Sequence, residues 1–295
     1  MMKRFFALAI IAGLIAPASA VLAHGVVGDY TFIEPLITED ANPKNEFDIL
    51  KPKWLRTSEG REFSLGFSLE KMLAPNLSVE IGSTWTSLSP KQGADVSGFD
   101  SLEIFPKYAF LTVPEHEFRL SIAADLELPT GNPSVQSQNH TTLGPVLLWA
   151  KGLGDIPNWS GLKYLRPFGL AGDFGYVPAL GGHTSHDMFA DQVIEYSLPY
   201  LSDNVRDVGL GWPLRNLYLF SEFNYDQLIT GPSGQTFPDI RATPGIAYMG
   251  RYVQLSLATQ FPLNHATAPN NHAAVLGLLD IFIDDLIPQT NWMPL

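Results

Sequence analysis

The amino-acid sequence predicts an all-β fold, an antiparallel transmembrane β-barrel of about twelve strands, and three observations lead to this prediction. Residues 62–85, EFSLGFSLEKMLAPNLSVEIGSTW, alternate apolar and polar side chains on both sides of a Pro-Asn turn. Such period-two alternation places the apolar side chains of a hairpin on one face. The alternating segments reach about ten or more residues, which suits a tilted membrane strand better than an ordinary globular strand. The connectors between them alternate between short and long, as in outer-membrane barrels.

Composition narrows the function classes. Charged residues make up only 16% of the 295 residues, against about 25% in a typical soluble domain. The chain has no cysteine, so it can form no disulfide, no thiolate nucleophile and no cysteine-based metal site. A net charge of −12 argues against a nucleic-acid partner, because nucleic-acid binding needs a basic surface.

The amino terminus predicts export. A basic start, MMKR, precedes the apolar run FFALAIIAGLIAPASAVLA, which ends in small residues. This pattern predicts a signal peptide over residues 1–23, cleaved after Ala20 or Ala23, and the alternative is an uncleaved anchor. No later segment approaches the roughly 20 apolar residues of a spanning helix. An exported barrel is expected in the outer membrane of a Gram-negative bacterium.

The barrel is expected over residues 46–284. The expected strands are 46–57, 62–73, 77–88, 101–112, 117–128, 141–153, 165–177, 192–201, 216–226, 239–249, 252–263 and 272–284. Short periplasmic turns and longer extracellular loops follow if both chain ends face the periplasm, although two near-side links, GDIPNWSGLKY and SDNVRDVGLGWPLR, are long. Residues 24–45 either fold back as a plug or lie in the periplasm, and residues 285–295 form a C-terminal tail that lacks a terminal aromatic residue.

The face opposite the lipid predicts an acidic lumen. Isolated charges are costly in a dry core unless they are paired, whereas a wet lumen tolerates them. This arrangement favours a passage that admits cations or neutral solutes, and the alternative is a lumen plugged by pairing among these groups. The expected lumen-lining residues are Glu62, Glu70, Glu80, Glu103, Lys107, Arg119, Asp125, Glu127, Asp173, Glu195, Glu222, Asp226, Arg241 and Asp280.

Histidines provide the candidate metal ligands. His183 and His186 lie in GGHTSHDMFAD, three residues apart and beside Asp187 and Asp191, so they could bind zinc or copper. His24 would begin the mature chain if cleavage follows Ala23, which would bring an amine and an imidazole together. The alternative is that these are solvated loop histidines. A plugged barrel that binds a metal or another ligand at its surface is therefore the second functional hypothesis.

Enzyme signatures are missing from the sequence. It contains no G-x-S-x-G elbow and no H-E-x-x-H helix. The segment HTSHDM lacks the Gly-Arg of the His-x-Ser-x-Gly-Arg signature of outer-membrane phospholipase. We therefore expect neither enzymatic activity nor a cofactor. A soluble periplasmic β-barrel is a third hypothesis.

Several segments carry a resemblance to a known family, namely HGVVGDYTF, FSLEKMLAPNLSVEIG, KYAFLTVPEHEFRLS, KYLRPFGLAG, EYSLPYL and LDIFIDDLIP. They resemble proteobacterial outer-membrane β-barrels grouped with meta-pathway phenol-degradation channel proteins. The resemblance implies a channel or transporter for small aromatic or hydrophobic solutes, and it supplies no site residue. The partners expected are outer-membrane lipid or lipopolysaccharide, the barrel-assembly machinery and a small-molecule solute.

Overall fold

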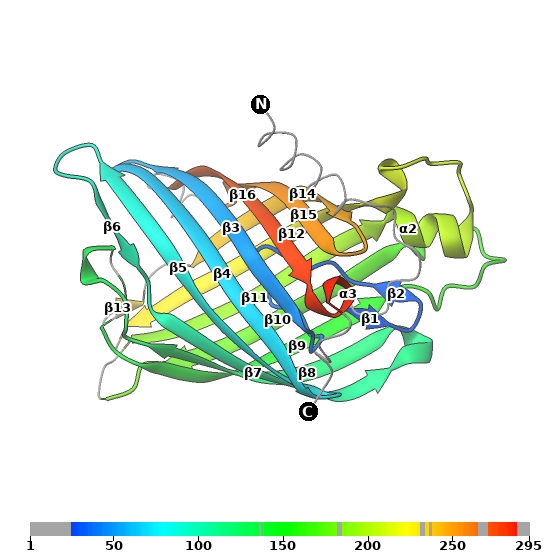
Figure 1. Ribbon diagram of the computed structural model, residues 1–295, viewed down its shortest axis with the longest axis horizontal. Coiled ribbons are helices and arrows are strands. Elements are labelled where there is room, and N and C mark those ends of the chain that lie inside the picture. Colours follow the sequence, from blue (N-terminus) through cyan, green and yellow to red (C-terminus); the bar gives the residue numbers. More distant parts are fainter. Residues whose placement is uncertain are drawn as a thin grey trace.

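The protein is a closed antiparallel β-barrel of twelve long strands (Figure 1). The computed structural model describes residues 25–135, 137, 139–181, 185–230, 234–235, 238–264 and 271–287. The long strands are β3 (Glu46–Thr57), β4 (Gly60–Ala74), β5 (Leu77–Pro90), β7 (Leu102–Val113), β8 (Phe118–Leu128), β9 (Thr142–Gly152), β10 (Phe168–Pro178), β11 (Ser185–Ser197), β12 (Leu217–Thr230), β14 (Asp239–Met249), β15 (Val253–Pro262) and β16 (Asn271–Phe282). Each pairs with its neighbours in chain order, and β16 pairs with β3 to close the barrel.

Short strands and helices lie at the two ends of the barrel. The short strands are β1 (Val26–Val27), β2 (Tyr30–Thr31), β6 (Val96–Phe99), which pairs with β5, and β13 (Gly234–Gln235), which pairs with β12. The helices are η1 (Pro114–His116), η2 (Pro133–Val135), η3 (Lys163–Leu165), α2 (Leu198–Tyr200), η4 (Leu201–Val205), η5 (Leu214–Asn216) and α3 (Ile283–Leu286). None of the helices in the described residues is long and apolar enough to cross a membrane.

The predicted fold class is confirmed, and most strand limits agree with the prediction within three residues. The structure differs most at β11, which begins at Ser185 where the sequence suggested 192. Met188 pairs with Tyr176 of β10 on one side and with Gln227 of β12 on the other. This double pairing extends the strand through a stretch expected to be an outer loop, so His186 lies on the barrel wall.

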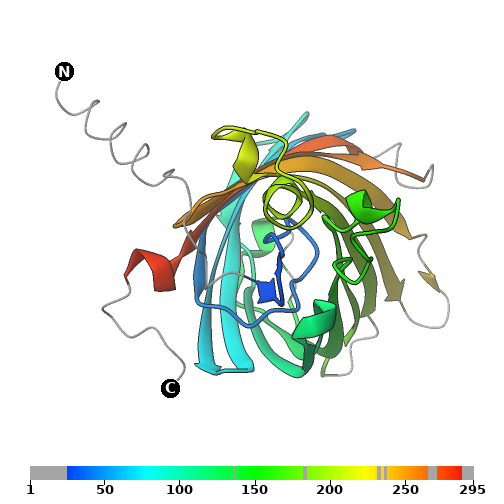
Figure 2. The same cartoon turned by 90° about the vertical axis from the view of Figure 1, so that its right-hand side faces the viewer.

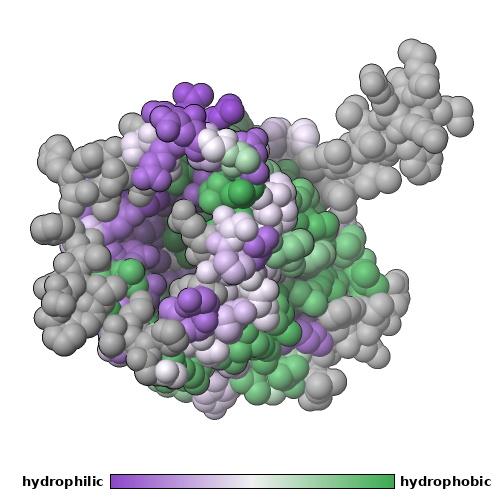
Figure 3. All heavy atoms as spheres, turned by 90° about the vertical axis from the view of Figure 1, so that its left-hand side faces the viewer, coloured by the Kyte–Doolittle hydropathy of each residue, from purple (hydrophilic) through white to green (hydrophobic). Residues whose placement is uncertain are grey.

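The outer wall is apolar, whereas the inner wall carries polar and charged side chains together with a buried apolar cluster that includes Leu148 and Phe220. Ile81 on β5 is 48% exposed, whereas Glu70, on the inward face of the adjacent β4, is 2% exposed. Figure 3 shows hydrophilic side chains around the hollow at one end and hydrophobic side chains over the outer wall beside it. The hairpin of residues 62–85 thus turns its apolar face outward, away from the barrel axis.

The chain before β3 lies inside the barrel. Residues 25–45, here called the inserted segment, begin with the β1–β2 hairpin and form a loop within the lumen (Figure 2). The loop enters and leaves at the end of the barrel where β3 begins and β16 ends, here called the terminal end. The opposite end, which carries the β3–β4 turn, is called the loop end.

Candidate functional site

The tip of the inserted segment is held by a single carboxylate. Glu222 on β12 is 0% exposed. Its oxygens accept hydrogen bonds from the backbone N–H groups of Leu36 at 2.8 Å, Ile37 at 3.0 Å and Thr38 at 2.8 Å, and from the Thr38 hydroxyl at 2.9 Å. Successive N–H groups that converge in this way form a concave anion site. The carboxylate therefore fixes the tip against the lumen wall.

Other strands hold the entering limb of the loop. The N–H of Ile33 donates to Glu195 at 3.2 Å. Gln254 on β15 binds the backbone of Glu34 twice, accepting from its N–H at 2.9 Å and donating to its carbonyl at 2.7 Å. Just past the tip, the N–H of Glu39 donates to Asp173 at 2.6 Å. Backbone groups that would otherwise be buried without partners are thus satisfied by side chains of the wall.

The returning limb is held by side chains of β8 and β4. Ser121 on β8 donates to the carbonyl of Ala41 at 2.5 Å. Arg119 donates to the side chain of Asn42 at 2.6 Å, and the N–H of Lys44 donates to Glu70 at 3.2 Å. Both limbs are therefore anchored to the barrel wall by hydrogen bonds.

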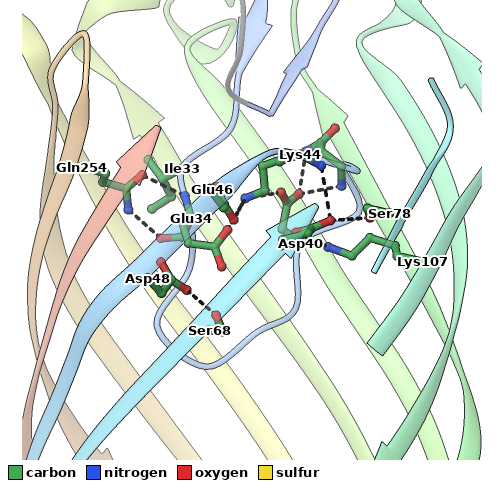
Figure 4. Close-up of polar contacts among 12 residues, drawn as sticks. Ile33, Glu34, Asp40, Lys44, Glu46, Asp48, Ser68, Ser78, Lys107 and Gln254 are labelled. Atoms are coloured by element: carbon green, nitrogen blue, oxygen red, sulfur yellow. Dashed lines mark hydrogen bonds and ion pairs between the residues drawn. The ribbon is translucent and has the colours of Figure 1, made fainter. Parts of the chain in front are cut away.

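A buried charge cluster lies in the lumen where the inserted segment meets the wall (Figure 4). Lys44 pairs with Glu34, with Asp40 at 2.8 Å and with Glu46 at 2.8 Å. Beside this cluster, Lys107 pairs with Glu70 at 3.3 Å. Such pairing is what makes charges tolerable where water is scarce.

Burial and neighbouring charges shift the titration of the inserted segment. Burial raises the pKa of Glu34 to about 7, although the Lys44 ammonium acts in the opposite direction. Burial also raises the pKa of the Asp40 carboxyl, but attraction to Lys44 and Lys107 outweighs that effect and leaves this pKa below its ordinary value. The pKa values of these two acids of the inserted segment are therefore shifted in opposite directions.

A cavity of about 560 Å³ lies beyond the tip of the inserted segment, toward the loop end. Its floor includes Leu36, Ile37 and Glu39, and Phe105 and Phe189 add apolar surface to its walls. A second hollow of about 510 Å³ adjoins it at Lys53 and continues to the β3–β4 turn. Together they form a vestibule between the inserted segment and the loop end.

Charge in this cavity is unevenly distributed. Its acidic residues are Glu39, Glu103, Asp125, Asp173, Asp191, Asp226 and Asp239, and its basic residues are Lys51, Lys53 and Arg241. Seven acids against three bases give a formal charge of −4. Most of the acids project from β7 to β12, whereas the bases project from β3 and β14. One wall of the cavity is therefore acidic, and the basic groups gather on the other.

The structure distributes the sequence-predicted lumen residues over the cavity, the second hollow, the contacts with the inserted segment and a few other positions. Glu103, Asp125, Asp173, Asp226 and Arg241 line the cavity, and Glu62 lines the second hollow. Asp173 also contacts the inserted segment, together with Glu70, Arg119, Glu195 and Glu222. Glu80 lies near Lys51 and Lys107, Glu127 lies near Ser101, and Asp280 is fully buried opposite Asp48 on β3.

Strict alternation missed the bases Lys51 and Lys53 for a local reason. The register of β3 against β4 shifts between Asp48 and Lys51. Ile49 and Leu50 are both exposed, at 36% and 40%. A bulge of this kind exchanges the inward and outward positions of the strand, so the inward side chains move from even to odd numbers. Two adjacent apolar residues in an alternating strand are the sequence signal of this shift.

The candidate metal ligands are not brought together within the described residues. His24 and His183 lie outside them. His186 on β11 stacks on Tyr176, with ring centroids 5.8 Å apart and planes at 14°. No group of three His, Cys, Asp or Glu side chains is arranged to hold a metal ion in the part of the chain that the structure describes. The metal site stays a prediction.

Comparison with known proteins supports the fold. No family model and no curated protein matches the sequence. An outer membrane channel from Pseudomonas putida F1 superposes with a TM-score of 0.59 at 11% identity, over 85% of this chain and 99% of that one. A KdgM porin gives 0.44 at 11% identity, over 79% and 97%. Outer membrane phospholipase A from Escherichia coli gives 0.41 at 11% identity, over 79% and 90%.

The likeness to the Pseudomonas putida channel shows that the chain has the fold of an outer-membrane β-barrel. The likenesses to the porin and the phospholipase are too weak to support an argument. None of the three bears on the phenol-degradation grouping, which stays a hypothesis.

Proposed function

We propose that the protein is an outer-membrane channel for small solutes, with a lumen narrowed by the inserted segment. The observation that carries this proposal is a charged cavity enclosed by a closed barrel whose outer wall is apolar. The apolar outer wall suits lipid, which disfavours a soluble periplasmic barrel. The charged inner wall requires water or pairing. The terminal end would face the periplasm of a Gram-negative bacterium, in keeping with the predicted signal peptide.

The charge of the cavity favours cations and neutral solutes over anions. A ring of acidic side chains attracts cations and repels anions of the same size. Leu36 and Ile37 on the floor, with Phe105 and Phe189 on the walls, add surface for the apolar part of a solute. An aromatic cation therefore matches the cavity better than an aromatic anion does.

Planar-bilayer recording tests the proposal. The purified protein should give discrete conductance steps, and the reversal potential in a salt gradient should favour cations. Liposomes that contain the protein should take up a benzyl quaternary ammonium faster than an aromatic sulfonate of similar size. A flat trace where a control porin conducts, together with no uptake of either solute, contradicts the channel.

A ligand-binding barrel whose inserted segment closes the lumen is the second candidate. The dense hydrogen bonding of the segment to Glu222, Glu195, Gln254 and Asp173 favours it, because a segment held on all sides leaves less freely passable space. In this case the wild-type protein should be silent in bilayers and conduct only after Glu222→Ala. Binding of the aromatic cation to the silent wild-type protein would then identify the vestibule as the ligand site.

A further inference from the structure

Two arginines face each other on the outer wall near the loop end. Arg56 is close to the end of β3 and Arg61 is close to the start of β4, and they form a direct cross-strand pair. Both side chains are exposed. Like charges placed opposite each other destabilise a strand pair. Neither arginine has an ion-pair partner among the described residues. The nearby Glu62 lines both the hollow inside the barrel mouth and the groove beside the arginines.

An aromatic surface lies directly beside this pair, closer to the middle of the barrel. Trp54, which is 50% exposed, packs across the strands on Phe63 with ring centroids 5.2 Å apart. Phe63 also contacts Trp85, at 6.3 Å. Rings of this kind mark the level of the membrane interface in barrels. The arginines stand two residues further along their strands, about 6.6 Å at the usual rise, which is the level of lipid headgroups.

The two features border one continuous hollow on the outer wall. A groove of about 550 Å³ runs along Trp54, Phe63 and Val275 and also reaches the arginines. It adjoins a hollow of about 720 Å³ bordered by both arginines and by Lys91. The combined surface is apolar toward the membrane centre and cationic toward the loop end. This is the shape and charge of a site for an anionic amphiphile.

We propose that this surface binds a phosphorylated, acylated lipid of the leaflet at the loop end. The phosphate lies between Arg56 and Arg61, because guanidinium groups bind phosphate oxygens through paired, charge-assisted hydrogen bonds. It neutralises the like-charged pair, and Lys91 adds a third cation. An acyl chain lies along Trp54 and Phe63. The site is on the outer wall, so it does not depend on whether the lumen conducts.

Native mass spectrometry of the full mature protein with added diphosphorylated lipid A tests the site. The wild-type protein should retain lipid A and should not retain phosphatidylcholine. The double variant Arg56→Gln/Arg61→Gln should bind about 30-fold more weakly, at about fivefold for each cation near an anionic headgroup. The matched control, Arg206→Gln/Arg251→Gln, removes the same charge from exposed positions at the terminal end and should bind like wild type.

Three outcomes overturn the proposal. The first is undiminished lipid A binding by the Arg56→Gln/Arg61→Gln variant. The second is an equal loss in the terminal-end control, because that result attributes binding to net charge alone. The third is displacement of lipid A by inorganic phosphate at equal concentration, because that result removes the role of the acyl chain. Heat modifiability in gel electrophoresis verifies that each variant is folded. Bilayer recording of the same variants measures conductance independently, so the lipid-binding test and the channel test can fail separately.

Discussion

Replacement of Glu222 by alanine should release the tip of the inserted segment. This carboxylate accepts three backbone N–H groups, those of residues 36–38, and the hydroxyl of Thr38. No other hydrogen-bond acceptor for the N–H groups of Leu36 and Ile37 is found among the described residues. Because the tip forms the floor of the cavity, its release should also widen the lumen.

The expected magnitude follows from these four hydrogen bonds. A hydrogen bond to a charged group contributes about 1.5–3 kcal/mol, and such contributions are not additive within one network. The variant also relieves the cost of burying the carboxylate, which is several kcal/mol for an ion. We therefore expect the docked tip to lose about 3 kcal/mol, which corresponds to about a 100-fold larger population of the released state.

Hydrogen exchange and bilayer recording measure the two consequences. Amide exchange at residues 36–38 should accelerate about 100-fold by the same arithmetic, and the single-channel conductance should increase. The control is Asp125→Ala, which removes a cavity carboxylate that accepts no hydrogen bond from the inserted segment in the described structure. Unchanged exchange at residues 36–38 in Glu222→Ala, or equal acceleration in the control, would refute the reasoning.

Three further predictions follow from the charges. Burial raises the pKa of Glu34 to about 7, so the docked segment binds this proton more tightly than the free segment does. The contribution of Glu34 to docking should therefore be fully present below about pH 4.5 and be lost as pH rises through 7. Conductance should then rise between pH 5 and 8, and equal pH profiles for wild type and Glu34→Gln would contradict this. Lys53→Gln should raise cation selectivity in reversal-potential measurements and Asp125→Asn should lower it, so shifts in the same direction would count against the acidic cavity. Lys107→Met should destabilise the barrel by about 3–5 kcal/mol because Glu70 loses its buried partner, as measured by denaturant unfolding in detergent; adding Glu70→Gln should restore part of the loss, and an unchanged midpoint in Lys107→Met would argue against the pair.

Local alternation was sufficient to predict most of the strands. In the hairpin of β4 and β5, each residue either faces the lipid side or faces the lumen, so the period-two pattern is nearly unbroken. The prediction was least accurate where a strand gains stability from two neighbours rather than from its own pattern. β11 illustrates this, since Asp187 and His186 pair with both β10 and β12 although their stretch reads as a polar loop.

Less of the candidate site than of the fold could be predicted from the sequence. Glu222 could be placed in the lumen by alternation, but its four donors come from a segment about 185 residues earlier in the chain. The contacts of Lys44 with Asp40 and Glu46 are local, yet they form only because the barrel surrounds them. Residues 25–45 have no periodic pattern, and their conformation is determined by hydrogen bonds and apolar packing with the wall. Such tertiary pairing has no local signal.

Both limbs of the inserted segment pass through the same mouth of the cylinder. The β1–β2 hairpin lies at that mouth, where the Tyr30 hydroxyl donates to the Pro167 carbonyl, and Asn45 returns there to accept from the N–H of Ile283 beyond β16. The segment is therefore a loop laid into the lumen and not a strand threaded through it. The segment can therefore leave and re-enter the lumen while β3 and β16 stay paired. This topology allows the barrel wall to form first and the inserted segment to enter it afterwards.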